Sequence, residues 1–324
     1  MAVSEIRAEP SYSPAADVER CVTCGEPAGT PYCASCGERR AADRPRSLAA
    51  LGEEIWDAFS PVDGRIGRTL WSLVRRPGEL TVAYMRGVRL TYLPPLRLFL
   101  IVNVLFFLHA SLSLSTRVSV PGAGRVRLSF GGNRMLDTPL AVHTNGVAHR
   151  YVARRFLRRR VPPRAGEDSA AYSARITRDY APAFDRNSTT QAKSLVVAMV
   201  PMFALLVAAL EWRRRRFALQ DVVFATHTMA FLLLLVIVAQ YVVGFPVGIA
   251  LVAMHTRPTA GDIDSVLSVG VGAPLMIWLT LGLRRAYGDG RLAAAAKALL
   301  LVFGLMFVLA AYRALLFFTV LFTT

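Results

Sequence analysis

The most regular feature of the sequence is a series of uncharged apolar runs separated by short arginine-rich turns. A helix that crosses a bilayer needs about 20 mostly apolar residues. On this basis we expect spans at residues 95–116, 194–210, 220–256, 265–283 and 298–322. The third run is too long for one upright helix, and Gly244, Phe245, Pro246 and Gly248 predict a break followed by a re-entrant piece. The pattern predicts an all-α polytopic membrane protein with about five transmembrane helices.

The arginines of the short turns set the expected orientation, because cytoplasmic loops of membrane proteins carry an excess of Arg and Lys. The turn after the second span contains Arg213 to Arg216, and the turn after the fourth contains Arg284, Arg285, Arg291 and Lys297. We therefore expect a bacterial inner-membrane protein with its N-terminus in the cytoplasm and its C-terminus outside. No signal peptide is expected, because the first strongly apolar run begins near residue 98.

The segment 117–193 is then predicted to be an extracytoplasmic loop. It carries fifteen Lys and Arg and five Asp and Glu, so its net charge is 15 − 5 = +10. This places positive charge on the side where it is least expected, but the charge rule is reliable only for loops of up to about 60 residues. Apolar residues alternate from Val118 to Phe130 around Pro121 and Gly122, which predicts a small hairpin.

Composition supports the membrane interpretation and limits the alternatives. The chain is 54% hydrophobic and 19% charged, which is too apolar for an ordinary soluble domain. The net charge of 38 − 22 = +16 excludes an acidic disordered chain. Lys193 and Lys297 are the only lysines, and a preference for arginine also follows from a GC-rich genome. We expect no nucleic-acid partner, because the basic residues lie beside the predicted spans and Glu26 and Glu38 flank the cysteine motifs.

Four cysteines form two Cys-x-x-Cys-Gly motifs within residues 19–40, behind a predicted flexible N-terminus at 1–18. They are Cys21, Cys24, Cys33 and Cys36. This spacing is typical of zinc-ribbon-like knuckles, in which four thiolates bind one structural Zn²⁺ and leave no open position for catalysis. Because a segment of this size is too small to form a hydrophobic core, metal binding would provide its folding energy. Two disulfides, a redox pair and a rubredoxin-like iron site are the alternatives.

Residues 47–94 are predicted to form amphipathic juxtamembrane helices. Ser47 is the expected N-cap of the first helix, Leu70, Trp71 and Val74 form the apolar side of the second, and Pro77 opens a third that ends near Gly87. Arginines interleaved with aromatic residues suit the headgroup layer of an anionic bilayer. The candidate contacts to lipid phosphates are Arg75, Arg76, Arg86, Arg89 and Arg97. The alternative is that these helices pack on the cytoplasmic ends of the spans.

Several motifs together resemble the bacterial membrane proteins grouped as domain of unknown function 3667. They are the two knuckles, Arg76-Pro77-Gly78, Tyr84, Gly87-x-Arg89, Tyr92, Pro95-Leu-Arg97-Leu98-Phe99, Lys193-Ser194-Leu195, the run Val223 to Phe231, and Arg284-Arg285-Ala286-Tyr287-Gly288. The resemblance implies an integral membrane protein with a cytoplasmic zinc-ribbon-like head and no established activity. In that family the entry to the third span is commonly rich in histidine. Here only His227 matches, because Asp221 and Met229 occupy positions where histidine is expected.

Polar residues at membrane depth are functional candidates because they are costly in hydrocarbon. Asp221, His227, Gln240 and Arg313 are the candidates for an intramembrane polar site, and Asn103 and His109 are further polar residues of the first span. The alternative for each is a buried interhelical hydrogen bond or a side chain that reaches the interface. The sequence contains no nucleophile elbow, phosphate-binding loop, His-Glu-x-x-His motif or dinucleotide fingerprint, so we expect no catalytic residue.

Two hypotheses of different classes follow. The first is a non-enzymatic membrane adaptor or assembly factor, whose zinc-binding head meets a cytoplasmic protein partner. The second is a small-solute or ion transporter or channel that uses the polar residues of the third and fifth spans, together with the break at Gly244–Gly248.

Overall fold

The structure is a computed structural model that describes residues 20–27, 31–38, 64–111, 114–120, 124–130, 139–145, 150–212, 218–244, 246, 247, 250 and 260–324. The predicted N-terminal segment 1–18, the helix expected after Ser47 and most of the expected re-entrant piece lie outside these residues. The helices are α2 (Arg65–Arg75), α3 (Glu79–Arg86), α4 (Pro95–Ser111), α5 (Leu140–Asn145), α6 (Arg150–Arg160), α7 (Ser169–Arg175), α8 (Ala181–Leu195), α9 (Met199–Glu211), α10 (Ala218–Ala239), α12 (Ala260–Tyr287) and α13 (Arg291–Thr323).

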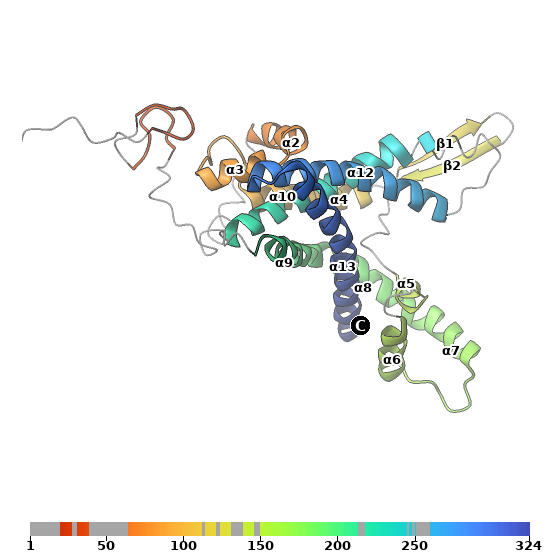
Figure 1. The fold of residues 1–324 in the computed structure, drawn as a ribbon. Coiled ribbons are helices and arrows are strands. Elements are labelled where there is room, and N and C mark those ends of the chain that lie inside the picture. The colour runs from red at the N-terminus through yellow and green to blue at the C-terminus, as the bar shows by residue number, and fades with distance from the viewer. Residues whose placement is uncertain are drawn as a thin grey trace, which may run out of the picture.

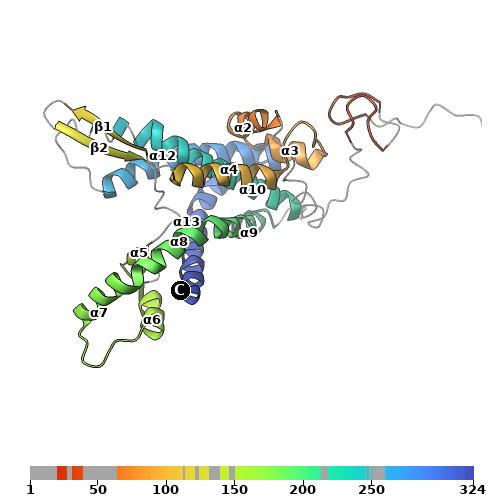
Figure 2. The same cartoon turned by 180° about the vertical axis from the view of Figure 1, so that it is seen from behind.

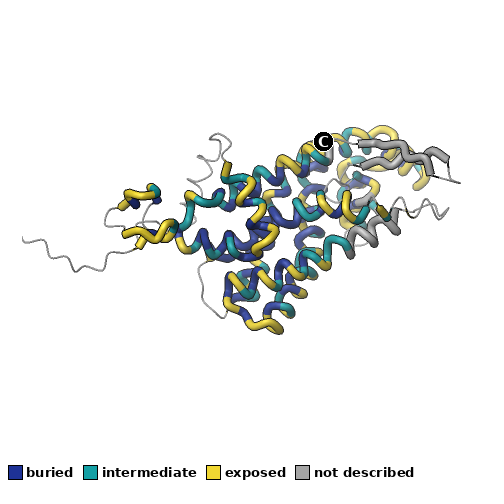
Figure 3. Tube along the Cα trace, turned by 90° about the horizontal axis from the view of Figure 1, so that it is seen from above, coloured by how far each residue is buried: buried dark blue, intermediate teal, exposed yellow. Residues whose placement is uncertain are grey.

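Helix α10 is the centre of the helical bundle (Figure 1). It packs against α4, α9 and α12, and the short helix α3 covers its first turns. A helix that is apolar on all sides is stable only when every side is covered, and most residues of α10 are buried. Its last turn, Gln240–Gly244, is a π-helix. Seen from above, the buried residues follow the facing sides of the bundle helices, and the exposed residues lie on their outer sides (Figure 3).

Three helices among the described residues are long and apolar enough to cross a membrane. They are Ser169–Glu211, Ala218–Gly244 and Arg291–Thr323, and Pro95–His109 is a shorter apolar helix. The molecule is therefore a membrane-type helical protein, as the sequence predicts. The count of five spans stays a prediction.

The second apolar helix begins well before the residue that the sequence pattern predicts. The expected span starts at residue 194, whereas the helix runs from Ser169 to Glu211 and includes the end of the segment expected as a loop. Asp168 caps its start by accepting a hydrogen bond from Ala171 N at 2.6 Å. Pro182 lies in the first turn of α8, directly after the π-helical turn Ile176–Tyr180, and does not end the helix. Hydropathy marks where the helix becomes apolar, not where it begins.

The antiparallel pairing of Ser169–Glu211 with α13 defines two ends of the bundle. Gln191 and Asn187 donate hydrogen bonds to Thr323 and Thr324 at one end. At the other end Lys297 contacts Glu211. We call the end with α3, Glu211 and the turn 288–290 the head end, and the end with α5–α7 and the C-terminus the far end. Figures 1 and 2 show the cysteine segment beyond α3 and the helices α5–α7 on the opposite side of the molecule.

The predicted hairpin is present. Strands β1 (Leu114–Val120) and β2 (Gly124–Phe130) pair antiparallel with Val118 opposite Val126. It follows α4 and extends away from the bundle (Figure 2).

Candidate metal centre

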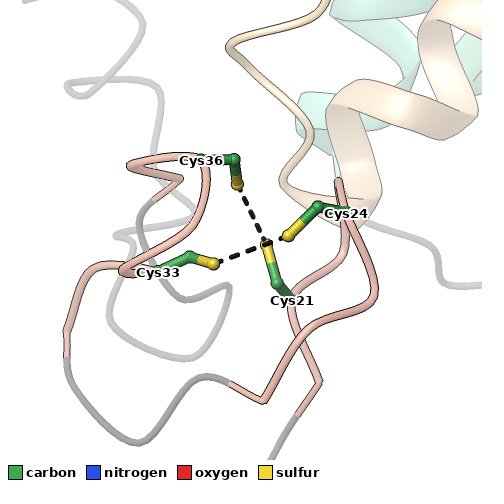
Figure 4. Close-up of side chains that lie close together, drawn as sticks. All are labelled: Cys21, Cys24, Cys33 and Cys36. Atoms are coloured by element: carbon green, nitrogen blue, oxygen red, sulfur yellow. Dashed lines mark hydrogen bonds between the residues drawn. The ribbon is translucent and has the colours of Figure 1, made fainter.

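The four cysteines converge on one point (Figure 4). All four sulfurs lie within 4.8 Å of one another, and the Cys21–Cys36 and Cys24–Cys33 pairs are each 3.5 Å apart. None of the four forms a disulfide. A tetrahedral zinc with Zn–S bonds of about 2.3 Å separates its sulfurs by about 3.8 Å. The geometry therefore fits a four-thiolate site for a single metal ion.

The two motifs form the same turn twice, which explains why the sulfurs converge. Cys21 N donates to Glu26 O and Gly25 N to Cys21 O, and the second motif repeats these bonds from Cys33 to Glu38 and from Gly37 to Cys33. Gly25 and Gly37 have φ of 79° and 74°. This left-handed conformation is accessible to glycine without the steric cost that other residues meet. The glycine after each second cysteine thus returns the chain and turns both thiols of its motif inward.

The turns also favour the deprotonated thiol at Cys33. Backbone hydrogen bonds from Cys36 and Ser35 lower the pKa of Cys33 to about 7. At Cys36 the backbone of Glu38 acts in the same direction, but burial and the three neighbouring thiols outweigh it and raise the pKa to about 12. Four thiolates at these distances repel one another, so their joint deprotonation requires a cation between them.

The carboxylate of Glu38 attaches the metal centre to the juxtamembrane helices. It is 2% exposed, and one of its oxygens, Oε2, accepts hydrogen bonds from Arg89 N at 3.1 Å, Leu90 N at 3.1 Å and Thr23 Oγ1 at 2.9 Å. Thr23 belongs to the first knuckle, whereas Arg89 and Leu90 follow α3. One side chain therefore joins both knuckles to the loop that leads into α4.

The first knuckle has a glutamate at the equivalent position. Glu26 follows Gly25 as Glu38 follows Gly37, but Glu26 is exposed. The two turns are alike in backbone geometry, so the difference comes from what lies beside them. Only the second knuckle places its glutamate against the loop at Arg89 and Leu90.

The loop that receives Glu38 is fixed on its other side by α2. Arg65 Nη1 donates to Leu90 O at 3.3 Å, and Thr69 Oγ1 accepts a hydrogen bond from Leu93 N at 3.1 Å. Helix α2 packs through Thr69, Ser72 and Leu73, while Trp71 is 62% exposed and Val74 is also exposed. Of the apolar side that the sequence predicts for α2, Trp71 and Val74 thus face away from the protein, whereas Leu70 packs against the hydrophobic core.

Helices α2 and α3 are held against α12 by backbone contacts. Trp278 Nε1 donates to Leu73 O at 2.8 Å, and Arg285 Nη1 donates to Pro77 O at 3.0 Å. Gly78 has a φ of 79°, and a Cβ atom there would lie 2.7 Å from the backbone oxygen of Gly282. The Arg76-Pro77-Gly78 motif is therefore a close contact between two backbones.

The structure gives separate partners to three of the four predicted intramembrane polar residues. Tyr287 OH donates to Asp221 Oδ1 at 2.8 Å, and a hydrogen bond of 3.0 Å joins His227 Nδ1 to Thr81 Oγ1. Asp221 and Gln240 are 19 residues apart on one helix, which is about 28 Å at 1.5 Å per residue. The contacts between these side chains are interhelical hydrogen bonds rather than one shared site.

Two further polar residues that the sequence predicts, Gln240 and His109, lie at the ends of α10 and α4 away from the head end. Gln240 Oε1 and His109 Nε2 are 2.8 Å apart, and Tyr241 OH lies 3.1 Å from His109 Nδ1. This brings two residues that the sequence analysis singled out, His109 and Gln240, into one cluster. Arg313 is half-buried on α13. Beside it, Tyr312 OH donates to Ala192 O at 3.2 Å.

The arginines proposed for lipid phosphates divide into two groups. Arg75, Arg76 and Arg86 are exposed. Arg89 and Arg97 are half-buried, and the Arg89 guanidinium lies 3.9 Å from the centre of the Tyr84 ring. Arg75 lies 4.5 Å from the ring centre of the exposed Trp71. The exposed surface of α2 therefore combines aromatic, aliphatic and cationic groups, which suits a membrane interface.

A buried charge cluster at the head end was missed by the sequence analysis. Lys297 Nζ contacts Glu211 Oε1 at 2.5 Å and both oxygens of Asp289 at 3.1 Å. Both carboxylate residues are buried. The cluster joins the end of α9, the turn before α13 and α13 itself. Its one signal in the sequence is the rarity of lysine, since a chain that otherwise uses arginine keeps a lysine here.

These features define a class: a membrane-type helical protein whose N-terminal head could hold one metal ion on four cysteines. Residues 63–107 match the sequence model of the family described as "Protein of unknown function (DUF3667)", which confirms the resemblance over α2, α3 and most of α4. The matched part is 45 of the 324 residues and does not include the cysteines. No curated protein and no solved structure matches the chain.

Proposed function

We infer that the protein is a non-enzymatic adaptor or assembly factor of the bacterial inner membrane, which presents a zinc-binding head to a cytoplasmic protein partner. The observation that carries this proposal is the attachment of the head by Glu38. A four-cysteine site of this kind is structural, because the metal has no open position for a substrate. The head is fixed at the membrane-proximal loop, so its outer surface is available for binding.

The head exposes apolar side chains for such a partner. Val22 is 42% and Tyr32 is 58% exposed, on a segment with almost no core of its own. Exposed aromatic and aliphatic side chains on a small rigid surface are typical of protein contacts. The proposed partner therefore binds the head through apolar contacts, and the metal maintains the shape of that surface.

The polar residues of the bundle support an anchoring role more than transport. A transport path needs polar groups that face a common cavity. Asp221 and His227 instead bond to Tyr287 and Thr81, both within the packed head end. Gln240 forms a hydrogen bond with His109 near the opposite end of α10. Each contact joins polar groups of two helices, and those of Asp221 and His227 are buried, as expected of a structural bundle.

The proposed topology has five spans, with the head end in the cytoplasm and the far end outside. It is supported by Arg284, Arg285 and Arg291 beside the turn 288–290, and by the four arginines that the sequence carries at 213–216 between the second and third spans. Zinc is the metal of this proposal, because cytoplasmic thiols are kept reduced and four thiolates suit Zn²⁺.

The proposal is tested by photo-crosslinking in cells that express the full-length chain. A photoreactive residue replaces Val22, and the same residue replaces Trp212 in a control chain, at an exposed position outside the head. We expect a discrete protein adduct from position 22, with no such adduct from position 212. The adduct should disappear when Cys21→Ser is added, whereas Glu26→Gln should leave it unchanged. No adduct from position 22, or an adduct that persists with Cys21→Ser, would contradict an adaptor role for the metal-bound head.

A further inference from the structure

A groove of about 610 Å³ lies at the far end, where α5, α6, α7 and α8 meet. Its volume falls within the range of small-molecule sites, about 300–1,000 Å³. Arg154 and Arg158 contribute to one wall and are four residues apart on α6, so they share one face of that helix. Ser169, Ser173 and Thr177 contribute to another wall at the same spacing. The groove thus places two guanidinium groups and three hydroxyl groups around one space.

Part of the groove lining is apolar. Leu157, Tyr172 and Ile176 line it and are buried. Asp185 is the one acidic residue among the lining residues, and its Oδ1 accepts a hydrogen bond from Leu140 N at 2.8 Å. A ligand for this groove therefore needs an anionic group that binds the arginines and a less polar part that contacts the apolar lining.

The position of Arg154 is fixed by the fold. Its Nε donates to Thr144 O at 2.9 Å, which ties the side chain to α5. The surrounding segment has excess positive charge: residues 150–193 contain 11 Lys and Arg and 4 Asp and Glu, a net 11 − 4 = +7. Two of the acids, Glu167 and Asp179, already pair with Arg175 and Arg178. The net positive charge around the groove therefore favours the binding of an anionic ligand.

The groove lies beside the end of an apolar helix. Helix α6 packs on α13 through Phe156 and Phe318, with ring centres 5.1 Å apart. Helix α8 reaches Thr323 through Gln191. Where α13 leaves the hydrocarbon layer, the phosphates of lipid headgroups are the most abundant anions.

We propose that this groove binds a phosphate ester, with Arg154 and Arg158 on the phosphate oxygens and Ser169 and Ser173 as hydroxyl donors. Arginine suits this role because its planar group forms two parallel charge-assisted hydrogen bonds to one phosphate. Tyr172 and Ile176 contact the apolar part of the ligand. The phosphate belongs to an anionic lipid headgroup or to a soluble ester, and the experiment below separates these sources.

The test uses the purified full-length protein in detergent and native mass spectrometry. Phosphatidylglycerol is titrated against phosphatidylcholine, which has the same phosphodiester but no net charge. We compare the wild type, the double variant R154Q/R158Q, the single variant R158Q, and the control R155Q/R159Q. The control removes the same charge from the same helix at exposed positions that are not among the residues lining the groove. Thermal unfolding without lipid shows that each variant is folded.

We expect tighter binding of phosphatidylglycerol than of phosphatidylcholine by the wild type. R154Q/R158Q should weaken the binding of phosphatidylglycerol roughly tenfold to hundredfold, because each lost hydrogen bond joins a charged guanidinium group to the phosphate. R158Q should give a smaller loss in the same direction, and R155Q/R159Q should stay within about twofold. Glycerol phosphate that displaces the lipid identifies a soluble ester as the ligand, and lack of displacement identifies the headgroup. Equal losses in both double variants, or equal binding of the two lipids together with no effect of glycerol phosphate, would overturn the proposal.

Discussion

The two ends of the bundle treat charge in opposite ways. At the head end, polar and charged groups are buried and join elements that are far apart in the sequence, as Lys297 joins α13 to Glu211 of α9, and as Glu38 joins the knuckles to the loop after α3. At the far end Arg154 and Arg158 are exposed, and the ion pairs join near neighbours in the chain, as the exposed Arg178 does with Asp179 and the half-buried Arg175 with Glu167.

The difference indicates which end is fixed and which end is open to ligands. Buried charges remain stable only when their partners are held in place, so the head end must be rigid to exist at all. Exposed arginines cost little to leave in water and keep their hydrogen-bonding capacity for a ligand. We therefore expect substitutions at the head end to change stability, and matched substitutions at the far end to change binding.

The largest effect is expected at Lys297. Lys297→Met keeps most of the side-chain volume but removes the cation between two buried carboxylates. Removing one partner of a buried ion pair lowers the free energy of unfolding by about 3–5 kcal/mol. Thermal unfolding of the purified protein in detergent measures this loss. Lys193→Met is the control, because it removes the only other lysine at an exposed position. Equal losses in the two variants would show that the cluster does not stabilise the head end.

The sequence predicts the class of fold and the four cysteines that could hold a metal ion, because both depend on local patterns. Four cysteines at knuckle spacing meet wherever the two turns form, and apolar runs become buried helices in any arrangement of the bundle. The hairpin at 114–130 is likewise local, since its strands are adjacent in the chain. These features require no knowledge of which helices are neighbours.

The contacts of single polar residues could not be predicted in the same way. His227 meets Thr81 across 146 positions, and Glu38 meets Leu90 across 52. Both contacts depend on how α2 and α3 dock on α10 and α12. The hydropathy pattern contains no information about that docking. The same limit explains why the start of the helix at Ser169 was missed, since its first turns are polar and meet α6 and the loop after it, through Tyr172 and Arg175, only in the folded protein.

A second comparison uses two glycines with nearly the same backbone conformation. Gly78 at the head end has a φ of 79°, and Gly166 at the far end has a φ of 77°. A Cβ atom at Gly78 would lie 2.7 Å from Gly282 O, whereas nothing lies within 4 Å of one at Gly166. Gly166→Ala should lower the free energy of unfolding by about 1–2 kcal/mol, because alanine is strained in the left-handed conformation. Gly78→Ala should cost a further 1–3 kcal/mol or so, because two backbones must separate.

Thermal unfolding of both alanine variants measures this difference. If the head end is the more rigid of the two ends, Gly78→Ala lowers the midpoint clearly more than Gly166→Ala does. Equal shifts would mean that α2 and α3 can move away from α12 without loss, and the distinction between a fixed and an open end would then be wrong.

The smallest effect, and the most local one, is expected from the glutamates that follow the two knuckles. Glu38→Gln keeps the size of the side chain but replaces a charged acceptor by a neutral one, which weakens its three hydrogen bonds by about 1 kcal/mol in total. Hydrogen exchange at the amides of Arg89 and Leu90 should then be roughly fivefold faster. Glu26→Gln makes the same chemical change at the exposed equivalent and should leave these amides unchanged. Metal content should be unchanged in both variants, since no thiol is altered. Faster exchange in both, or in neither, would show that the head is not attached to the membrane-proximal loop through Glu38.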